Sequence, residues 1–119
     1  MLKNTNQQKE TMTKEITLKF IDNQSHGYIQ ISKYDLQGLD IDIKEFSKYS
    51  YYNDNNACYY FEVDFNLFFF IAPNRLAVED CDGYKLDKIL KSKGYSINYK
   101  TNHVALNYMN DPIFKRINA

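Results

Sequence analysis

Four side chains of the kinds that bind metal ions or act as nucleophile and base lie far apart in this sequence: His26, Cys58, Cys81 and His103. Structural zinc sites usually take their ligands from closely spaced pairs such as Cys-x-x-Cys, and these residues form no such pair. We therefore predict no metal and no other cofactor. The cysteines fit reduced thiols that pack as small hydrophobic side chains, and the histidines fit surface loops.

The segment Glu79-Asp80-Cys81-Asp82 is a second place where chemistry could sit. The N-terminus of a following helix would favour a thiolate at Cys81, but the three neighbouring carboxylates oppose that charge. The carboxylates could instead hold a divalent cation or act as general acid and base. We favour the interpretation that Asp82 caps the helix. We predict that the protein is not an enzyme, with a carboxylate- or thiol-dependent enzyme at residues 79–82 as an alternative.

Known phosphate-binding and hydrolase motifs are missing from the chain. Its four glycines are isolated from one another, so they form no glycine-rich phosphate loop. The Walker, Gly-x-Ser-x-Gly and His-Glu-x-x-His patterns are missing as well. The sequence therefore indicates binding more readily than catalysis.

The strongest binding signal is an acidic, tyrosine-rich stretch over residues 49–64. Because side chains alternate along a strand, Tyr49 and Tyr51 should share one face, with Tyr52 on the other. Exposed tyrosines are typical of binding hot spots, and the acids among them should attract a basic partner and repel phosphates. We predict a partner-binding surface made of Tyr49, Tyr51, Tyr52, Asp54, Tyr59, Tyr60, Glu62 and Asp64.

The zero net charge of the chain hides an uneven distribution. Residues 22–82 carry eleven acids and four bases, whereas residues 83–119 carry seven bases and two acids. Either the two parts neutralise each other within one fold, which we favour, or the basic part steers a charged partner. The alternative site is a lysine-rich nucleic-acid-binding helix over residues 83–93, with a solvated helix face as the simpler interpretation. Its lysines are Lys85, Lys88, Lys91 and Lys93.

Length and composition indicate one globular domain. The chain has 119 residues, of which 44% are hydrophobic and 25% charged, as in ordinary soluble proteins. It has no apolar run long enough to span a membrane, and the polar N-terminus does not resemble a signal peptide, so we expect a cytoplasmic protein. We expect a disordered N-terminal segment over 1–14 and a single domain over 15–119.

The hydrophobic pattern predicts an α+β fold. Strict alternation over 15–22 and 28–32 predicts an opening hairpin, and Leu86, Ile89 and Leu90 form the apolar stripe of a principal helix over 83–93. Short helical turns are expected over 33–37 and 43–46, and after the Asp111-Pro112 pair. Residues 104–109 fit either a strand or a helix. Further strands are expected over 49–52, 57–64, 67–72, 75–79 and 95–99. We predict an antiparallel sheet of hairpins or a meander, with the helix packed on one face.

Three short motifs also occur in a fixed order: Ser25-His26-Gly27-Tyr28-Ile29, Lys48-Tyr49-Ser50-Tyr51 and Val78-Glu79-Asp80-Cys81-Asp82. In this order they resemble a small HGY/YSY/EDCD-type domain of unknown function found in phage, plasmid and other mobile-element proteins. The resemblance spans residues 15–99, and this chain departs from it by an extra apolar segment over 61–76. It implies a mobile-element context, in which small single domains often block host defence or host enzymes by binding them.

These observations lead to one principal hypothesis and two alternatives. We expect a non-enzymatic binding or inhibitor protein of a mobile genetic element, which occludes a host protein or ribonucleoprotein in an anti-defence, anti-CRISPR-like manner. The alternatives are a small nucleic-acid-binding accessory protein that uses the 83–93 helix, and the enzyme at residues 79–82. We expect no membrane partner. The sequence sets neither the identity of the partner nor the oligomeric state.

Overall fold

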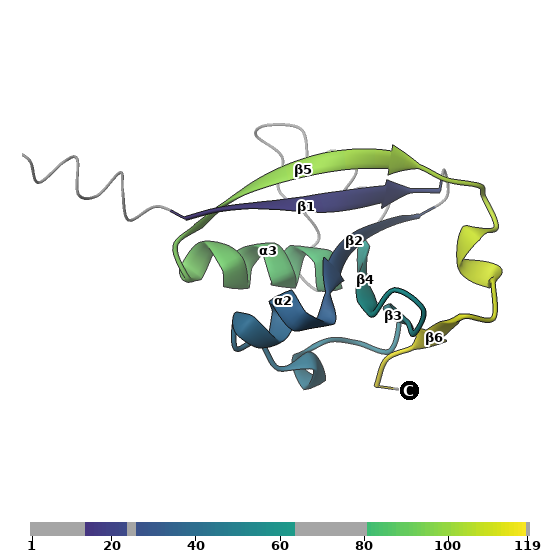
Figure 1. Cartoon of the computed structure of the whole chain (residues 1–119), viewed down its shortest axis with the longest axis horizontal. Helices are drawn as coiled ribbons and strands as arrows, with labels where there is room; N and C mark the ends of the chain where they lie inside the picture. Colours follow the sequence, from purple (N-terminus) through teal and green to yellow (C-terminus); the bar gives the residue numbers. More distant parts are fainter. Residues whose placement is uncertain (1–13, 24–25, 64–80, 119) are drawn as a thin grey trace, which may run out of the picture.

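The computed structural model describes residues 14–23, 26–63 and 81–118, which form a six-stranded sheet in the order β5-β1-β2-β4-β3-β6 (Figure 1). Neighbouring strands run antiparallel except β1 and β5, which are parallel. The strands are β1 (Lys14–Asp22), β2 (Gly27–Ser32), β3 (Tyr51–Asn53), β4 (Cys58–Val63), β5 (Tyr95–His103) and β6 (Phe114–Arg116).

The predicted opening hairpin is β1 paired with β2, and Phe20 lies opposite Ile29 in its register. Gly27 begins β2 where the ring of Phe20 lies directly over the backbone. A Cβ atom at this position would come within 2.5 Å of Cζ of Phe20, so any side chain would displace the ring. Gly27 is therefore needed for close packing within the sheet.

The hairpin of β3 and β4 forms where the run of asparagines predicts a turn. The Asn53 side chain accepts a hydrogen bond from the Asn55 N–H at 2.8 Å, and Asn56 accepts one from the Cys58 N–H at 3.1 Å. Ala57 takes a positive φ of 55° and closes the turn. Within the turn, where the two strands do not pair, these side-chain oxygens accept the backbone N–H hydrogen bonds.

The first core lies between the sheet and its principal helix, α3 (Asp82–Ser92). Leu86 and Leu90 of α3 are fully buried and pack with Phe20, Ile29 and Phe61 from the central strands. Two shorter helices, α2 (Lys33–Gly38) and η1 (Ile43–Glu45), form where short helical turns are expected, after the N-caps Ser32 and Asp42. α2 lies on the same side of the sheet as α3 (Figure 1).

The C-terminal segment covers part of the opposite face. It leaves the end of β5, forms the short 3-10 helix η3 (Tyr108–Asn110) and ends beside β3 as strand β6 (Figure 1). Met109 and Phe114 of this segment pack on Ile21, Tyr28 and Tyr60, which form a second core. The segment thereby links one edge strand of the sheet to the other.

The α+β prediction is confirmed, with one principal helix on a sheet and several short helical turns. The sheet is mixed rather than wholly antiparallel because β5 pairs with β1 in the parallel direction. The strands predicted over 67–72 and 75–79 lie outside the described residues. No helix in the described part of the chain has the length and apolar character needed to cross a membrane.

The C-terminal elements settle one open expectation and correct another. Residues 104–107 form a loop, and Tyr108 and Met109 belong to the short 3-10 helix η3, so the helical alternative holds only for the end of this range. The helical turn expected after Pro112 is instead strand β6, in which Phe114 pairs with Asn53. The ring of Phe114 lies 5.1 Å from that of Tyr60, measured between centroids. This tertiary packing outweighs the local preference of proline for the first turn of a helix.

The expected helix cap is also corrected. The N-cap of α3 is Cys81, whose Sγ accepts the Tyr84 N–H at 3.3 Å. Asp82 is the first helical residue, and its side chain is 1% exposed. It accepts hydrogen bonds from the Ser47 N–H at 3.0 Å, the Ser47 hydroxyl at 2.7 Å and the Ser50 hydroxyl at 2.5 Å. We call this arrangement of Asp82, Ser47 and Ser50 the Asp82 clamp.

The Asp82 clamp connects four parts of the fold. Ser50 is itself fully buried, and its Oγ accepts the Glu62 N–H of β4 at 2.9 Å. The Ser50 carbonyl accepts the Ile117 N–H, just beyond β6, at 3.0 Å. Through these bonds, one carboxyl group fixes the 47–50 loop against α3, β4 and the C-terminal segment.

We expect Asp82→Ala to lower the free energy of unfolding by about 3 kcal/mol or more, because it leaves the half-buried Ser47 donors and the buried Ser50 hydroxyl without their acceptor. Urea unfolding followed by circular dichroism measures the change. Glu15→Ala, at an exposed position of β1, is the matched control and should change stability by less than about 0.5 kcal/mol. Equal stability of the two variants would contradict a structural role for the clamp.

Candidate functional site

A cleft of about 370 Å³ opens on the sheet face that the C-terminal segment partly covers. Its walls come from β2, β3, β4, β6 and η3 and from the loops that precede β2, β3 and η3. We call it the tyrosine cleft. Its lining residues are Asn23, His26, Tyr28, Tyr49, Tyr51, Glu62, Leu106, Met109, Asn110 and Arg116.

Strand register brings the charged and aromatic residues of the cleft together. Tyr28 of β2 lies opposite Glu62 of β4, and Tyr51 of β3 lies opposite Arg116 of β6. Cross-strand partners lie close enough for their side chains to interact. The floor of the tyrosine cleft is therefore a row of sheet positions that are far apart in the sequence.

Arg116 is held in a defined orientation by aromatic rings and one carbonyl group. Its guanidinium carbon lies 4.9 Å from the ring centre of Tyr51 and 6.0 Å from that of Tyr49. Its Nη1 donates a hydrogen bond to the Lys48 carbonyl at 3.1 Å. The Lys48 ammonium lies 5.9 Å from the Tyr49 ring. Cation–π contacts at these distances favour this position of the Tyr49 ring, although its residue surface is 58% exposed.

Tyr28 is the most buried tyrosine of the cleft, at 5% exposed. Burial raises the pKa of Tyr28 to about 12, and the neighbouring Tyr51 and Glu62 add to this effect while Arg116 opposes it. The Tyr28 and Tyr51 rings meet edge to face, with centroids 5.9 Å apart. At neutral pH, Tyr28 is therefore an uncharged hydroxyl in the wall of the cleft.

The structure divides the predicted partner-binding surface between the two faces of the sheet. Tyr49, Tyr51 and Glu62 line the tyrosine cleft. Tyr52 and Tyr59 pack together on the α3 side, with ring centroids 4.8 Å apart. This division follows from strand alternation, as the sequence predicts.

Two further residues of that surface are corrected or not described. Tyr60 is fully buried in the second core and so cannot belong to an exposed surface, because the C-terminal segment covers its side of the sheet. Asp64 lies outside the described residues.

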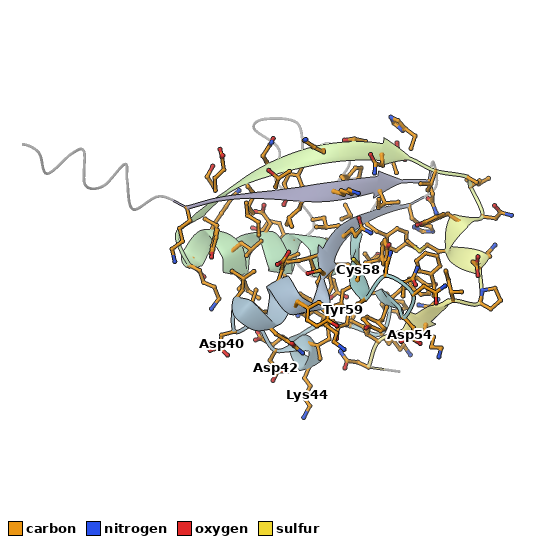
Figure 2. The ribbon with its side chains drawn as sticks, viewed as in Figure 1. Asp40, Asp42, Lys44, Asp54, Cys58 and Tyr59 are labelled. Carbon is orange, nitrogen blue, oxygen red and sulfur yellow. The ribbon has the colours of Figure 1, made fainter. Side chains whose placement is uncertain are left out.

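The acidic character expected of this region is partly neutralised within the fold. Asp54 forms an ion pair with Lys115 of β6 at 3.1 Å. Asp54, labelled in Figure 2, lies in the turn between β3 and β4. The pairing of β6 with β3 thus brings C-terminal bases onto the acidic segment, as expected if the two parts of the chain neutralise each other.

The sequence does not predict the positions of several cleft residues. Arg116, Leu106 and Met109 belong to the segment whose pattern predicts no clear element or a helical turn. Their position depends on the long-range pairing of β6 with β3 and on packing against the second core. For Tyr28 the sequence does hold a signal. Side chains alternate along a strand, so Tyr28 should face away from the α3 side if Ile29 faces toward it.

The lysine-rich helix is partly engaged within the fold. Lys85 donates a hydrogen bond to the Glu45 carbonyl at 2.6 Å, and its ammonium lies 6.0 Å from the Phe46 ring. Lys91 forms an ion pair with Asp87 at 3.0 Å. Lys88 and Lys93 are exposed. The four lysines therefore do not form one uniform basic surface.

The residues considered for catalysis or metal binding remain dispersed. Cys81 is buried as the α3 cap and Asp82 belongs to the clamp, while Glu79 and Asp80 lie outside the described residues. Burial raises the pKa of the half-buried Cys58 thiol, which disfavours its thiolate. Within the described ranges, no group of three or more histidine, cysteine, aspartate or glutamate side chains is placed to hold a metal ion.

Comparison with known proteins adds no relative: no protein-family model matches the chain, and neither the curated proteins nor the solved structures contain a significant match.

We expect alkaline pH to destabilise the protein partly through Tyr28. Because its pKa rises from 10 to about 12 on folding, its contribution to stability is complete below about pH 10 and is lost as the pH rises through about 12. Between about pH 10 and pH 12, the free energy of unfolding of the wild type should fall by about 2 kcal/mol more than that of Tyr28→Phe. Urea unfolding at several pH values, with phenolate absorbance, measures this difference. Tyr34→Phe, at an exposed position, should follow the wild type; a Tyr28→Phe profile that does the same would contradict the assignment.

Proposed function

We propose that this protein is a non-enzymatic binding protein that captures a partner protein in the tyrosine cleft and thereby occludes part of that partner's surface. The observation that carries the proposal is the exposure of Tyr49 and Leu106, each 58% exposed, in the lining of one concave site. Large, exposed side chains at a concavity are typical of protein-binding hot spots.

The preorganisation of the cleft supports this proposal. Tyr49 lies within the 47–50 loop that the Asp82 clamp fixes, and its ring contacts the cations of Lys48 and Arg116. A side chain that is already held in place loses little conformational entropy when a partner binds. An exposed tyrosine in a fixed loop can therefore contribute strongly to affinity.

The motif resemblance supplies the biological context of the proposal. We place the protein in a mobile genetic element and in the cytoplasm, with a host protein or ribonucleoprotein as its partner and an anti-defence role. A small domain that acts by occlusion needs a surface that binds tightly, and the tyrosine cleft offers one. Nucleic-acid binding through α3 is less well supported, because Lys85 and Lys91 already have partners within the fold.

We expect Tyr49→Ala to weaken partner binding by about 30-fold, equivalent to about 2 kcal/mol, with little loss of stability. The immobilised full chain should first capture its partner from nuclease-treated host lysate, and calorimetry with the purified partner should then give the dissociation constant. Tyr34→Ala is the matched control because Tyr34 is 66% exposed on α2, outside the cleft.

Two outcomes would contradict the proposal. One is a captured partner whose affinity is the same for the wild type and Tyr49→Ala. The other is binding of single-stranded or duplex DNA with a steep salt dependence that is lost in a Lys88→Glu, Lys93→Glu double variant. These two lysines are exposed, so the double variant disturbs neither the Asp87 ion pair nor the Glu45 contact.

A further inference from the structure

Arg116 has an oriented guanidinium group with N–H donors beyond the one that bonds to the Lys48 carbonyl. The Tyr51 and Tyr49 rings and the Lys48 carbonyl fix its position, and one nitrogen carries the bond to that carbonyl. None of the ion pairs among the described residues includes Arg116. A guanidinium has five N–H donors arranged to bind a carboxylate through two parallel hydrogen bonds. The Arg116 guanidinium is therefore oriented to donate hydrogen bonds to an anionic group.

The charges near Arg116 favour an acidic ligand. The ammonium of Lys48 lies beside Tyr49, on the same rim. Asp54, which the sequence suggests as a source of negative field, is paired with Lys115. Glu62 is the acidic member of the cleft lining, and it is half-buried on the sheet floor opposite Tyr28. The rim around Tyr49 is consequently cationic, although the tyrosine-rich segment itself is acidic in sequence.

We infer that the tyrosine cleft binds an acidic segment of the partner protein, with an aspartate or glutamate carboxylate on Arg116 and a neighbouring apolar side chain against Tyr49 and Leu106. This inference rests on the proposed function and names the chemistry of the partner. It reverses the expectation from the sequence, which favours a basic partner.

The cations of Arg116 and Lys48 determine where the acidic group can lie. Both lie beside the Tyr49 ring, so the acidic residue belongs at this rim. The residue that follows into the cleft should be uncharged, where it can pack on Leu106 and Met109. The site thus selects an acidic residue next to an apolar one rather than a continuous acidic run.

A peptide fits these features better than a nucleic acid does. A nucleic acid brings regularly spaced phosphates, whereas Arg116 is the only lysine or arginine among the described residues that line the cleft. The exposed Leu106 and the buried Met109 offer apolar contact rather than a stacking platform. A single carboxylate with an apolar neighbour satisfies both the charge and the apolar lining.

The test is selection of random dodecapeptides displayed on phage against the immobilised full chain. We expect enrichment of peptides that carry aspartate or glutamate beside a leucine, methionine or aromatic residue. Fluorescence anisotropy with a selected synthetic peptide should show about tenfold weaker binding or more for Arg116→Gln. Lys93→Gln, which removes an exposed charge just after α3, should change the affinity less than twofold.

A charge exchange separates recognition from loss of folding. The selected peptide with its acidic residue replaced by lysine should bind Arg116→Glu more tightly than it binds the wild type. Circular dichroism verifies that Arg116→Glu remains folded. Binding that does not depend on the charge at position 116 would overturn the inference.

The remaining outcomes distinguish this inference from the proposed function. Enrichment of basic peptides whose binding is lost in Tyr49→Ala would overturn the acidic ligand while leaving the protein-binding cleft in place. Failure to enrich any peptide that depends on Tyr49, together with binding of labelled single-stranded RNA, would overturn both.

Discussion

The buried carboxyl group of Asp82 is the constraint on which the arrangement of this molecule depends. A buried polar group must find hydrogen-bond partners, and Asp82 finds them in the 47–50 loop rather than in its own helix. Since Ser50 also bonds to β4 and to the residue after β6, the loop is tied to both of these parts of the chain. The position of Tyr49 in the cleft follows from this network. Binding geometry and stability therefore share the same few hydrogen bonds.

The two faces of the sheet have different roles. The α3 face holds a large aliphatic and aromatic core in which Leu86, Leu90 and Phe61 are fully buried. The opposite face is covered by an irregular segment that leaves a cleft beside its short 3-10 helix. A loop-rich cover leaves concave surface that a well-packed helix would fill, and function is often located on such loops. The larger core and the candidate binding site thus lie on opposite sides of the sheet.

The sequence predicts the elements that depend on local patterns. The β1–β2 hairpin follows from strict alternation, α3 from its apolar stripe, and the β3–β4 turn from a run of asparagines. It does not predict β6, because only the distant partner Asn53 makes Phe114 a strand residue. The sequence does not predict the Asp82 clamp for a similar reason. An aspartate that caps a helix and an aspartate that accepts hydrogen bonds from a distant loop look alike in sequence. The tyrosines of the site are recognisable by type, and strand alternation predicts their division between the two faces. The burial of Tyr60 and the position of Arg116 depend on tertiary structure.

The position of Arg116 after all the other cleft residues in the sequence has a consequence for synthesis. The long-range pairs β1–β5 and β3–β6 can form only after β5 and β6 have left the ribosome, which makes this a topology of high contact order. Arg116 is the last of the cleft residues to be translated, and until it emerges Tyr51 has no cross-strand neighbour on that side. Nascent and prematurely terminated chains therefore carry tyrosines without the guanidinium that orients them. The binding site is completed together with the edge of the sheet, so a chain that cannot close its sheet also cannot engage a partner in the proposed manner.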